Sequence, residues 1–520
     1  MVSPDGKGIG KVIFSSSLGT LIEWYDFYIF GMLAKTISAQ FFPEGNDTAA
    51  LLSTLAIFAA GFLVRPFGAL VFGRLGDMIG RKSTFLLTLV LMGGSTFLIG
   101  LIPGYKTIGI AAPLLVLLLR LIQGLALGGE YGGAATYVAE HSPTNRRGYY
   151  TSWIQTTATL GLFVALGVIM AVKSNMSDAD FSSEWGGWRY PFWISILLVG
   201  VSIYIRLRMK ESPLYSKLKK EGKTSVNPLK ESFGHKANFK MVLLALFGAV
   251  MGQGVIWYTG QFYAQSFLEN TVKIEFMQNR EILLWGIGLA TPFFLVFGAL
   301  SDRIGRKWIM LTGMLLGVVF YRPIFRTFMK DTDVKEWMKK SEVISKEINK
   351  KTELKADPAS DTANRLIIIH SSIHWGLKDG SNFVEHTIDT SIQGSGAPSS
   401  LIKQAYKPSY TDKILPTQLK WKFIFLVFIM ILFVTMAYAP IAAFLVELFP
   451  TKIRYTSMSL PYHIGNGVFG GLVPFIATLL STSFENDPLV GLWYPIGVAG
   501  LCFIIGTLYL SNKIDKNIKD

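Results

Sequence analysis

The sequence has few of the residues on which soluble enzymes and redox proteins depend. Of its 520 residues only 16% are charged, and Cys502 is the single cysteine. One cysteine leaves no intramolecular disulfide and no cysteine metal cluster. There is no G-x-x-x-x-G-K-[ST] phosphate loop, which disfavours an ATP-driven pump, and no enzyme-like constellation of side chains. We therefore expect no catalysis and no cofactor. No cleavage site follows the first apolar run, so we expect it to be a membrane span and not a signal peptide.

Apolar residues, by contrast, are abundant. They make up 50% of the chain, and the mean hydropathy is +0.39. Because they fall into many long runs, the sequence predicts a protein that crosses the lipid bilayer several times. The net charge is +15, but the basic residues lie in short loops between the runs. No basic domain is left to bind nucleic acid.

The apolar runs are long enough to form membrane-spanning helices. A helix needs about 20 residues to cross the hydrocarbon layer. We predict twelve spans, at residues 12–36, 52–75, 83–103, 112–139, 149–172, 189–207, 241–268, 281–300, 308–326, 421–447, 456–480 and 488–511.

The short loops indicate the orientation of the chain. Lysine and arginine follow the even-numbered spans, and residues 206–240 hold ten basic against three acidic residues. The loops on the opposite side, such as "PEGNDT", carry almost none. Positively charged loops remain on the cytoplasmic side. We therefore expect a multi-pass plasma-membrane protein with both termini in the cytoplasm.

Two motifs occur twice. "GRLGDMIGRKS" at 73–83 is repeated as "GALSDRIGRKW" at 298–308, and "EHSPTNRR" at 140–147 is repeated as "ELFPTKIR" at 447–454. The same order in both copies indicates two parallel six-helix halves. The second pair lies farther apart than the first, which indicates an insertion. The predicted parts are an N-terminal half (1–207), a cytoplasmic linker (208–240), helices 7 to 9 (241–326), an extracellular insertion (327–420) and helices 10 to 12 (421–520).

The insertion is polar and mixed in charge. "DTDVKEWMKKSEVISKEINKK" has the apolar spacing of a helix, whereas "NRLIIIHSSIHW" is typical of one or two strands. Such a segment is either a decoration without a direct role or a module that captures substrate or binds a partner. His370, His374 and His386 lie in it, but their spacing does not favour a metal site.

Beyond these patterns, the repeated G-x-x-x-D-x-x-G-R-K loop resembles the signature of the major facilitator superfamily. "GTLIEWYDFYIFG", "RLIQGLALGGEYGGAATYVAEHSP" and "SMSLPYHIGNGVFGGLVP" are similar to the metabolite:proton symporter family of bacteria and archaea. The first loop departs from the pattern at Met78, where a basic residue is common. The resemblance implies an all-α membrane fold of twelve helices in two pseudo-symmetric halves, acting as a monomer. Members carry carboxylates, keto acids, shikimate-like compounds, proline and betaines.

Charged residues of the repeated motifs are placed to form a cytoplasmic network. Asp77 and Asp302 can accept hydrogen bonds from helix N-termini or arginines, and glycine allows close helix approach. We expect the network to act as a latch that holds the inner helix ends together; the alternative is that the charges only set topology. The expected gate residues are Gly73, Asp77, Gly80, Arg81, Lys82, Glu140, Arg147, Asp302, Gly305, Arg306, Lys307, Glu447 and Arg454.

The N-terminal half also places charges near mid-membrane: Glu23, Asp26, Arg65, Arg120 and Glu130. A charge at that depth is costly and suggests a function. We interpret Asp26 as the proton carrier with Arg120 as its partner, a pairing that the resemblance supports; the alternative is a permanent salt bridge. Glu130 is either a packed carboxyl or a second titrating group. Arg65 either binds an anionic substrate or pairs with Glu23.

Polar and aromatic residues of helices 4, 7 and 11 are the expected substrate contacts. They are Gln123, Gln253, Trp257, Tyr258, Gln261, Tyr462, His463 and Asn466, alongside Arg65. The related family usually has asparagine where His463 stands, so this residue is either a titrating group or a packing residue.

These observations predict a secondary transporter that moves a small organic solute together with protons by alternating access. The solute would be a carboxylate, an amino acid or betaine, or a sugar-like metabolite. One alternative is an uncoupled facilitator of the same fold. Another is a transporter-like receptor that uses the insertion, although no signalling domain follows the last span.

Overall fold

The structure is a computed structural model that describes residues 9–79, 81–128, 135, 138–139, 142–208, 234–356, 365–393, 408–449, 454–484 and 487–512. The chain forms two compact units. Unit 1 comprises Met1–Ala264, Leu284–Pro323 and Leu426–Asp520, and unit 2 comprises Gln265–Leu283 and Ile324–Phe425. The boundary falls inside helices, and each unit is described on its own.

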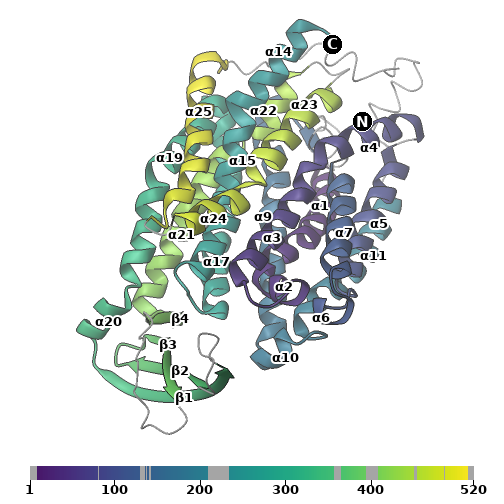
Figure 1. The fold of residues 1–520 in the computed structure, drawn as a ribbon. Coiled ribbons are helices and arrows are strands. Elements are labelled where there is room, and N and C mark those ends of the chain that lie inside the picture. Colours follow the sequence, from purple (N-terminus) through teal and green to yellow (C-terminus); the bar gives the residue numbers. More distant parts are fainter. Residues whose placement is uncertain are drawn as a thin grey trace. The chain divides into compact units, whose positions relative to one another are not determined.

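The N-terminal half of unit 1 is helical throughout its described part (Figure 1). Its long helices correspond to the first six predicted spans, and short helices lie in the loops between them. The elements are α1 (Ile9–Met32), α2 (Ala34–Phe41), α3 (Asp47–Leu63), α4 (Arg65–Ile79), α5 (Arg81–Ile99), α6 (Tyr105–Ile108), α7 (Ala111–Leu127), α9 (Arg147–Lys173), α10 (Asp178–Ser182) and α11 (Tyr190–Arg208).

The remaining helices correspond to the last six predicted spans, and π-helical turns interrupt two of these spans. They are α14 (Lys236–Ala245), η3 (Leu246–Val250), α15 (Met251–Tyr258), η4 (Thr259–Tyr263), α16 (Ala264–Asn270), α17 (Phe276–Ala290), α18 (Phe293–Ile304), α19 (Arg306–Asp331), α21 (Thr417–Tyr438), α22 (Ile441–Leu448), α23 (Arg454–His463), η5 (Ile464–Gly470), α24 (Val473–Ser483) and α25 (Trp493–Tyr509). A π-turn often marks a functional site. Here the π-turns η4 and η5 adjoin Tyr258 and His463, two of the expected substrate contacts.

The described parts of the predicted spans are helical. Within the described residues, eight helices are long and apolar enough to cross a membrane, and Leu86–Ile99 and Ala111–Leu127 are shorter apolar helices. The helix α1 begins and α25 ends at the same end of unit 1 (Figure 1).

Close backbone contact between α7 and the continuous helical span formed by α3 and α4 positions two arginines. A Cβ on Gly124 would lie 1.8 Å from the Gly61 carbonyl oxygen, and a Cβ on Gly128 would lie 2.1 Å from the Arg65 carbonyl oxygen. Glycine at these points lets the helices approach as small residues do in membrane proteins. Arg65 and Arg120 are thereby held on neighbouring helices, both buried.

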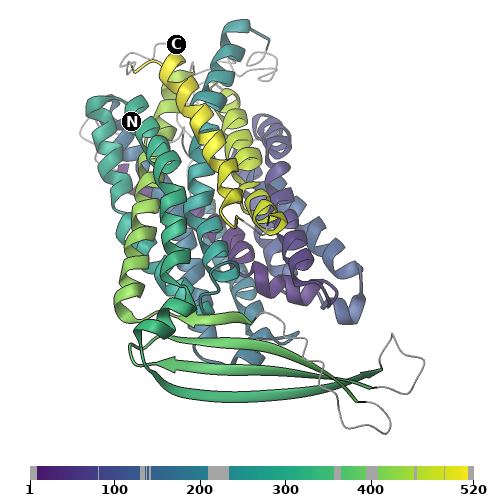
Figure 2. The same cartoon turned by 60° about the vertical axis from the view of Figure 1, so that its left-hand side comes forward.

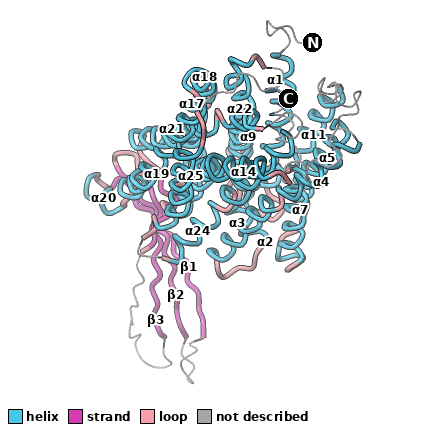
Figure 3. Tube along the Cα trace, turned by 90° about the horizontal axis from the view of Figure 1, so that it is seen from above, coloured by secondary structure: helices cyan, strands magenta, loops and turns pink. Residues whose placement is uncertain are grey.

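Unit 2 contains a four-stranded antiparallel sheet in the order β1-β2-β3-β4 (Figures 2 and 3). The strands are β1 (Val343–Ala356), β2 (Arg365–Leu377), β3 (Asn382–Gln393) and β4 (Ser409–Ile414), and the short helix α20 (Val334–Lys340) precedes them. The expected strand at "NRLIIIHSSIHW" is confirmed as β2.

The helix expected across "SEVISKEINKK" is wrong. Residues 343–356 form β1, whose Ile348 lies opposite Ile373 of β2. Pairing with an isoleucine-rich strand outweighs a local apolar spacing that also fits a helix. The helical part of the motif is limited to α20, and α19 continues to Asp331, past its predicted end at residue 326.

Unit 2 also buries a polar cluster that the sequence analysis missed. Arg280 donates from Nη1 to Glu269 Oε2 at 2.6 Å, and Gln265 donates from Nε2 to the same oxygen at 2.7 Å. The side chains of Arg280 and Glu269 are 1% and 3% exposed. Because each charge is paired, the cluster joins α16 to α17 without leaving an isolated buried ion.

Candidate functional site

The structure describes part of the predicted gate. The side chains of Gly73, Asp77, Gly80, Arg81, Lys82, Glu140 and Arg454 lie outside the described residues, as do those of Glu23 and Glu130. The predictions for them stay untested. The remaining gate residues, Arg147, Asp302, Gly305, Arg306, Lys307 and Glu447, are described.

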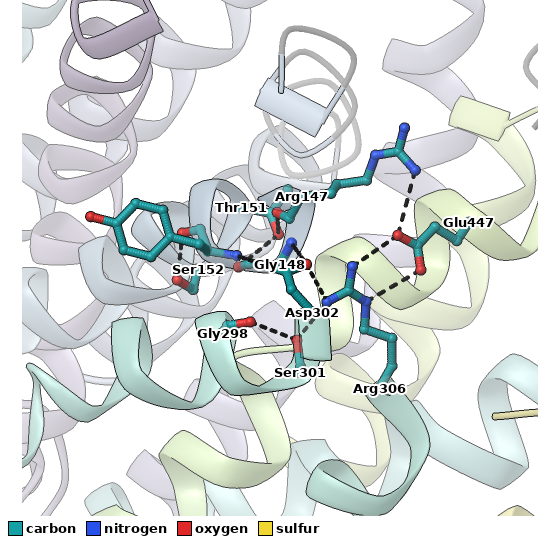
Figure 4. A network of polar contacts seen from close by, with 10 residues as sticks. Arg147, Gly148, Thr151, Ser152, Gly298, Ser301, Asp302, Arg306 and Glu447 are labelled. Carbon is teal, nitrogen blue, oxygen red and sulfur yellow. Dashed lines mark hydrogen bonds and ion pairs between the residues drawn. The ribbon is translucent and has the colours of Figure 1, made fainter. Parts of the chain in front are cut away.

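Asp302 caps a helix of the other half. Its two carboxylate oxygens accept hydrogen bonds from the backbone N–H groups of Gly148 at 2.8 Å and Tyr149 at 2.9 Å, in the first turn of α9 (Figure 4). A carboxylate at a helix N-terminus satisfies free amides and matches the positive end of the helix dipole. The repeated loop therefore joins α18 to α9.

Arg306 links this cap to a second acid. Its guanidinium lies 2.7 Å from Asp302 Oδ1 and 3.0 Å from Glu447 Oε1, and it also donates to Ser301 Oγ at 2.6 Å. Arg147 approaches Glu447 from α9 at 3.4 Å. We call Arg147, Asp302, Arg306 and Glu447 the latch. It connects α9 of the N-terminal half with α18, α19 and α22 of the C-terminal half.

Beside the latch, α9 and α18 touch backbone to backbone. A Cβ on Gly148 would lie 2.3 Å from Arg306 Nη1 and 2.6 Å from the Gly298 carbonyl oxygen, and a Cβ on Gly298 would lie 2.5 Å from Ser152 Oγ. Nothing larger than glycine fits there without displacement. In this conformation the two halves are therefore closed at the latch.

Two other gate residues hold the end of α25. Lys307 donates from Nζ to the carbonyl oxygens of Thr507 at 2.7 Å and Leu510 at 2.8 Å. Gly305 adopts φ +98°, and a Cβ there would meet the Asn512 side chain. A lysine on the last carbonyl groups of a helix caps it. These two residues brace α25, whereas the latch residues bridge the halves.

Asp26 is fully buried in α1, at 0% exposure. Among the described residues, no donor lies within hydrogen-bond distance of either carboxylate oxygen. The backbone carbonyl of Asp26 accepts instead from Gln123 Nε2 at 3.2 Å, and the same amide nitrogen donates to Thr96 Oγ1 at 2.8 Å.

Asp26 and Arg120 do not form a hydrogen-bonded ion pair in this conformation, so their pairing during a transport cycle stays a prediction. Arg120 donates to Gln123 Oε1, and its guanidinium carbon lies 4.4 Å from the centre of the Phe30 ring and 5.0 Å from that of Phe58. Gln123 thus bridges the arginine and the backbone of Asp26. Sequence spacing gives the depth of the two charges but not the direction of their side chains.

Arg65 lies in an aromatic environment. Its guanidinium carbon is 4.1 Å from the centre of the Phe62 ring and 5.4 Å from that of Trp24, within the range of a cation–π interaction. The arginine is buried, so its charge faces rings and not bulk water.

The predicted substrate contacts of helices 7 and 11 are all buried, and several meet. Asn466 donates from Nδ2 to Gln253 Oε1 at 3.0 Å, and the Tyr462 hydroxyl lies 2.6 Å from that of Tyr438. The His463 ring is 5.4 Å from the Tyr462 ring. Gln261 is buried, and neither its Oε1 nor its Nε2 has a hydrogen-bond partner within the described part of the chain.

Aromatic rings from both halves pack against one another beside these polar residues, in tilted and edge-to-face arrangements. The Trp257 ring centre is 5.7 Å from both Trp24 and Tyr28 of α1, and the Tyr258 ring centre is 5.0 Å from Phe62 of α3. The sequence analysis identified Trp257 and Tyr258 but missed their partners Trp24, Tyr28, Phe62, Phe262 and Tyr438. Aromatic residues are common in apolar spans, so composition alone does not distinguish these.

Comparison with known proteins identifies the family. The sugar (and other) transporter model matches residues 12–240. The inner membrane metabolite transport protein YhjE of Escherichia coli (strain K12) is 31% identical over 502 residues, covering 95% of this chain and 92% of the relative. The chain belongs to the sugar (and other) transporter family of the major facilitator superfamily. It is therefore a multi-pass membrane transporter of small solutes, not an enzyme.

Other relatives match shorter stretches of this transporter. The alpha-ketoglutarate permease of E. coli (strain K12) is 37% identical over 324 residues, 62% of this chain and 73% of the relative. The proline/betaine transporter of the same organism is 35% identical over 334 residues, 62% of this chain and 65% of the relative. Among solved structures, a D-xylose-proton symporter matches with a TM-score of 0.62 over 98% of this chain and 99% of that chain, at 15% identity. That likeness confirms the predicted fold.

Proposed function

We propose that this transporter is a proton-coupled symporter of a small carboxylate-bearing solute, in which Asp26 carries the proton. The observation behind the proposal is that Asp26 is fully buried and that no described donor bonds its carboxylate. An ionised carboxylate without a donor is costly in an apolar site, and binding a proton removes that cost. Opening the site to water would let the proton leave.

Gln123 supports this reading because it contacts both Arg120 and the backbone of Asp26. In the proposed cycle, a rotation of Gln123 or Arg120 would bring the guanidinium toward Asp26 when the proton is released. Arg120 would then stabilise the ionised form of Asp26. In the closed conformation it is joined to Asp26 through Gln123.

Arg65 is the proposed contact for the solute carboxylate. A guanidinium binds a carboxylate through paired hydrogen bonds, and the surrounding aromatic rings would contact the rest of a small solute. Relatives named for transport of alpha-ketoglutarate and of proline or betaine carry solutes that possess a carboxylate. We propose that the protein lies in the plasma membrane with both termini cytoplasmic, as its basic loops predict.

The test is solute-induced pH change in proteoliposomes, with wild type, Asp26→Asn and the exposed control Asp47→Asn. Carboxylates, amino acids, betaines and sugars are screened. We expect one carboxylate-bearing solute to alkalinise the outer medium with wild type and Asp47→Asn. With Asp26→Asn, net accumulation should be lost while solute exchange remains.

The rival is an uncoupled facilitator. It predicts that the solute equilibrates without proton movement and that Asp26→Asn behaves like wild type. A transported sugar with no carboxylate would leave coupling intact but contradict the role proposed for Arg65.

A further inference from the structure

The sheet in unit 2 has one edge strand that another segment covers and one that is paired on a single side. The outer side of β4 is covered, because Ile274 forms a β-bridge with Lys413, and Lys413 exchanges backbone hydrogen bonds of 2.9 Å with Lys273 and Glu275. The strand β1 pairs with β2 on one side only. Within the described residues, no other strand covers its outer edge.

This open edge is long and exposed. Residues 342–353 are all solvent-exposed, and Ile344 and Ile348 are 68% and 49% exposed. An edge of this kind presents free backbone N–H and C=O groups and is a template for another strand. β1 pairs with β2 along 343–356 and has one irregularity, between Val343 and Ser345, so the rest of the strand is regular.

A second copy of β1 can pair with this edge only in certain registers. Directly opposed residues of antiparallel strands lie on the same face of the sheet. A two-fold axis perpendicular to the sheet also places each residue and its copy on the same face of the combined sheet. One residue must therefore sit opposite its own copy, and each register is defined by that central residue.

Charge excludes most of the longer registers. Like charges directly opposite each other are destabilising. Registers centred on Lys346, Glu347, Lys350, Lys351 or Glu353 oppose a charge to its own copy, and the register centred on Ile348 sets Lys346 against Lys350.

Among the registers that pair at least seven residues of β1, two avoid this conflict, centred on Asn349 and on Thr352. The first pairs residues 343–355, whereas the second pairs only residues 348–356. The Asn349 register also sets Glu347 of each copy opposite Lys351 of the other, which gives two ion pairs related by the axis. It places Lys346 opposite Thr352, and Ser345 opposite Glu353.

We propose that two copies of this chain associate through β1, antiparallel and centred on Asn349, to form one continuous eight-stranded sheet. Like charges disfavour the other long registers, and the greater number of paired residues favours this one over the register centred on Thr352. The partner is a second copy because the strand is complementary to itself in charge. The proposal replaces the monomer expected from the family resemblance and does not depend on proton coupling.

Cysteine cross-linking of the full-length protein in membranes tests the register. The native Cys502 is fully buried, so engineered surface cysteines are the reactive ones. In Asn349→Cys, each cysteine meets its own copy at about 5 Å between Cβ atoms, and an oxidant or a short bifunctional maleimide should link the copies. In the matched control Thr352→Cys, the two cysteines are about 20 Å apart. A mixture of Lys346→Cys and Thr352→Cys should form a heterodimeric cross-link.

Charge reversal tests the ion pairs. Adding Glu347→Lys to Asn349→Cys places lysine opposite Lys351, and we expect cross-linking to slow roughly tenfold as two attractions become repulsions. Adding both Glu347→Lys and Lys351→Glu restores opposite charges and should restore the rate. Continued protection of Cys502 from maleimide reports that each variant is folded.

Three results would overturn the proposal. Absence of the Asn349→Cys cross-link in folded protein would exclude the dimer. Self-cross-linking of Thr352→Cys alone would establish the other register. Equal cross-linking of both variants would indicate random collision of mobile strands.

Discussion

The latch and the site around Asp26 differ in the partners that they give to a buried carboxylate. In the latch, Asp302 accepts two backbone hydrogen bonds and an arginine, and Arg306 joins it to Glu447. Asp26 is more completely buried but has no described donor on either oxygen. A charge with good partners favours one conformation, whereas a carboxylate without them is suited to exchange a proton. The same residue types therefore serve two functions, distinguished by their partners.

Loss of Arg306 should have the largest effect on the latch. Arg306→Gln would leave Asp302 and Glu447, 6% and 7% exposed, without their main cation. Breaking a buried ion pair costs about 3–5 kcal/mol. Here the loss would destabilise the closed conformation, which is the one that contains the latch. We expect a reporter cysteine introduced as Ser152→Cys, in α9 against Gly298 of α18, to react with maleimide much faster.

The matched control is Arg303→Gln, because Arg303 is an exposed arginine near the end of α18, in the same loop motif as Arg306. Its reporter should react at the wild-type rate. If Arg306→Gln behaved like Arg303→Gln, the latch would be a topological feature without conformational control.

A smaller increase in the reporter's reaction rate is expected when a larger side chain is placed in the contact between α9 and α18 beside the latch. Gly148→Ala places a methyl group 2.3 Å from Arg306 Nη1 and 2.5 Å from Ser301 Oγ. Overpacking costs about 1–3 kcal/mol, and it falls only on the closed conformation. The Ser152 reporter should again react faster, but less so than in Arg306→Gln.

The control for this change lies in the same helix. Gly167 has no heavy atom within 4 Å of its ideal Cβ position, so Gly167→Ala should leave the reporter unchanged. Equal effects of the two alanines would point to helix propensity and away from crowding.

The smallest expected effect is a pH dependence of the stability of unit 2 that arises from Lys413. Burial lowers the pKa of Lys413 from 10.5 to about 8, although the nearby Asp333 acts to raise it. The folded chain therefore loses this proton near pH 8, and the unfolded chain keeps it until about 10.5. Since the unfolded state binds more protons in that window, stability should rise with pH from 8 to 10.5.

Hydrogen exchange of β4 amides in the full chain measures this dependence. At each pH the wild type is compared with Lys413→Met, which cannot titrate. We expect the protection of wild type relative to the variant to increase between pH 8 and 10. A constant ratio would mean that Lys413 keeps its proton in the folded protein.

The helices and much of the latch could be predicted, because both depend on patterns that are visible in the sequence alone. Apolar runs of membrane length give the spans, and the repeated motifs point to Arg147, Asp302 and Glu447. The expectation that Asp302 accepts hydrogen bonds from a helix N-terminus or an arginine is confirmed. The sequence did not predict which helix it would be, because almost any residue type carries the backbone N–H groups that donate.

Other features depend on tertiary contacts. Gln123 replaces Asp26 as the partner of Arg120 because of side-chain direction, which depth in the membrane does not determine. The strand β1 follows from pairing with β2, against a local pattern that also fits a helix. The aromatic partners of Trp257 are hidden among many apolar residues of the same spans.

The most direct test of the contrast between paired and unpaired acids is infrared spectroscopy of the protein in nanodiscs at neutral pH. Hydrogen–deuterium exchange identifies the carbonyl stretch of a protonated carboxyl group. The account predicts a buried protonated band in wild type that is lost in Asp26→Asn and retained in Asp47→Asn and Asp302→Asn. A band that persists in Asp26→Asn, or disappears in Asp302→Asn, would contradict it.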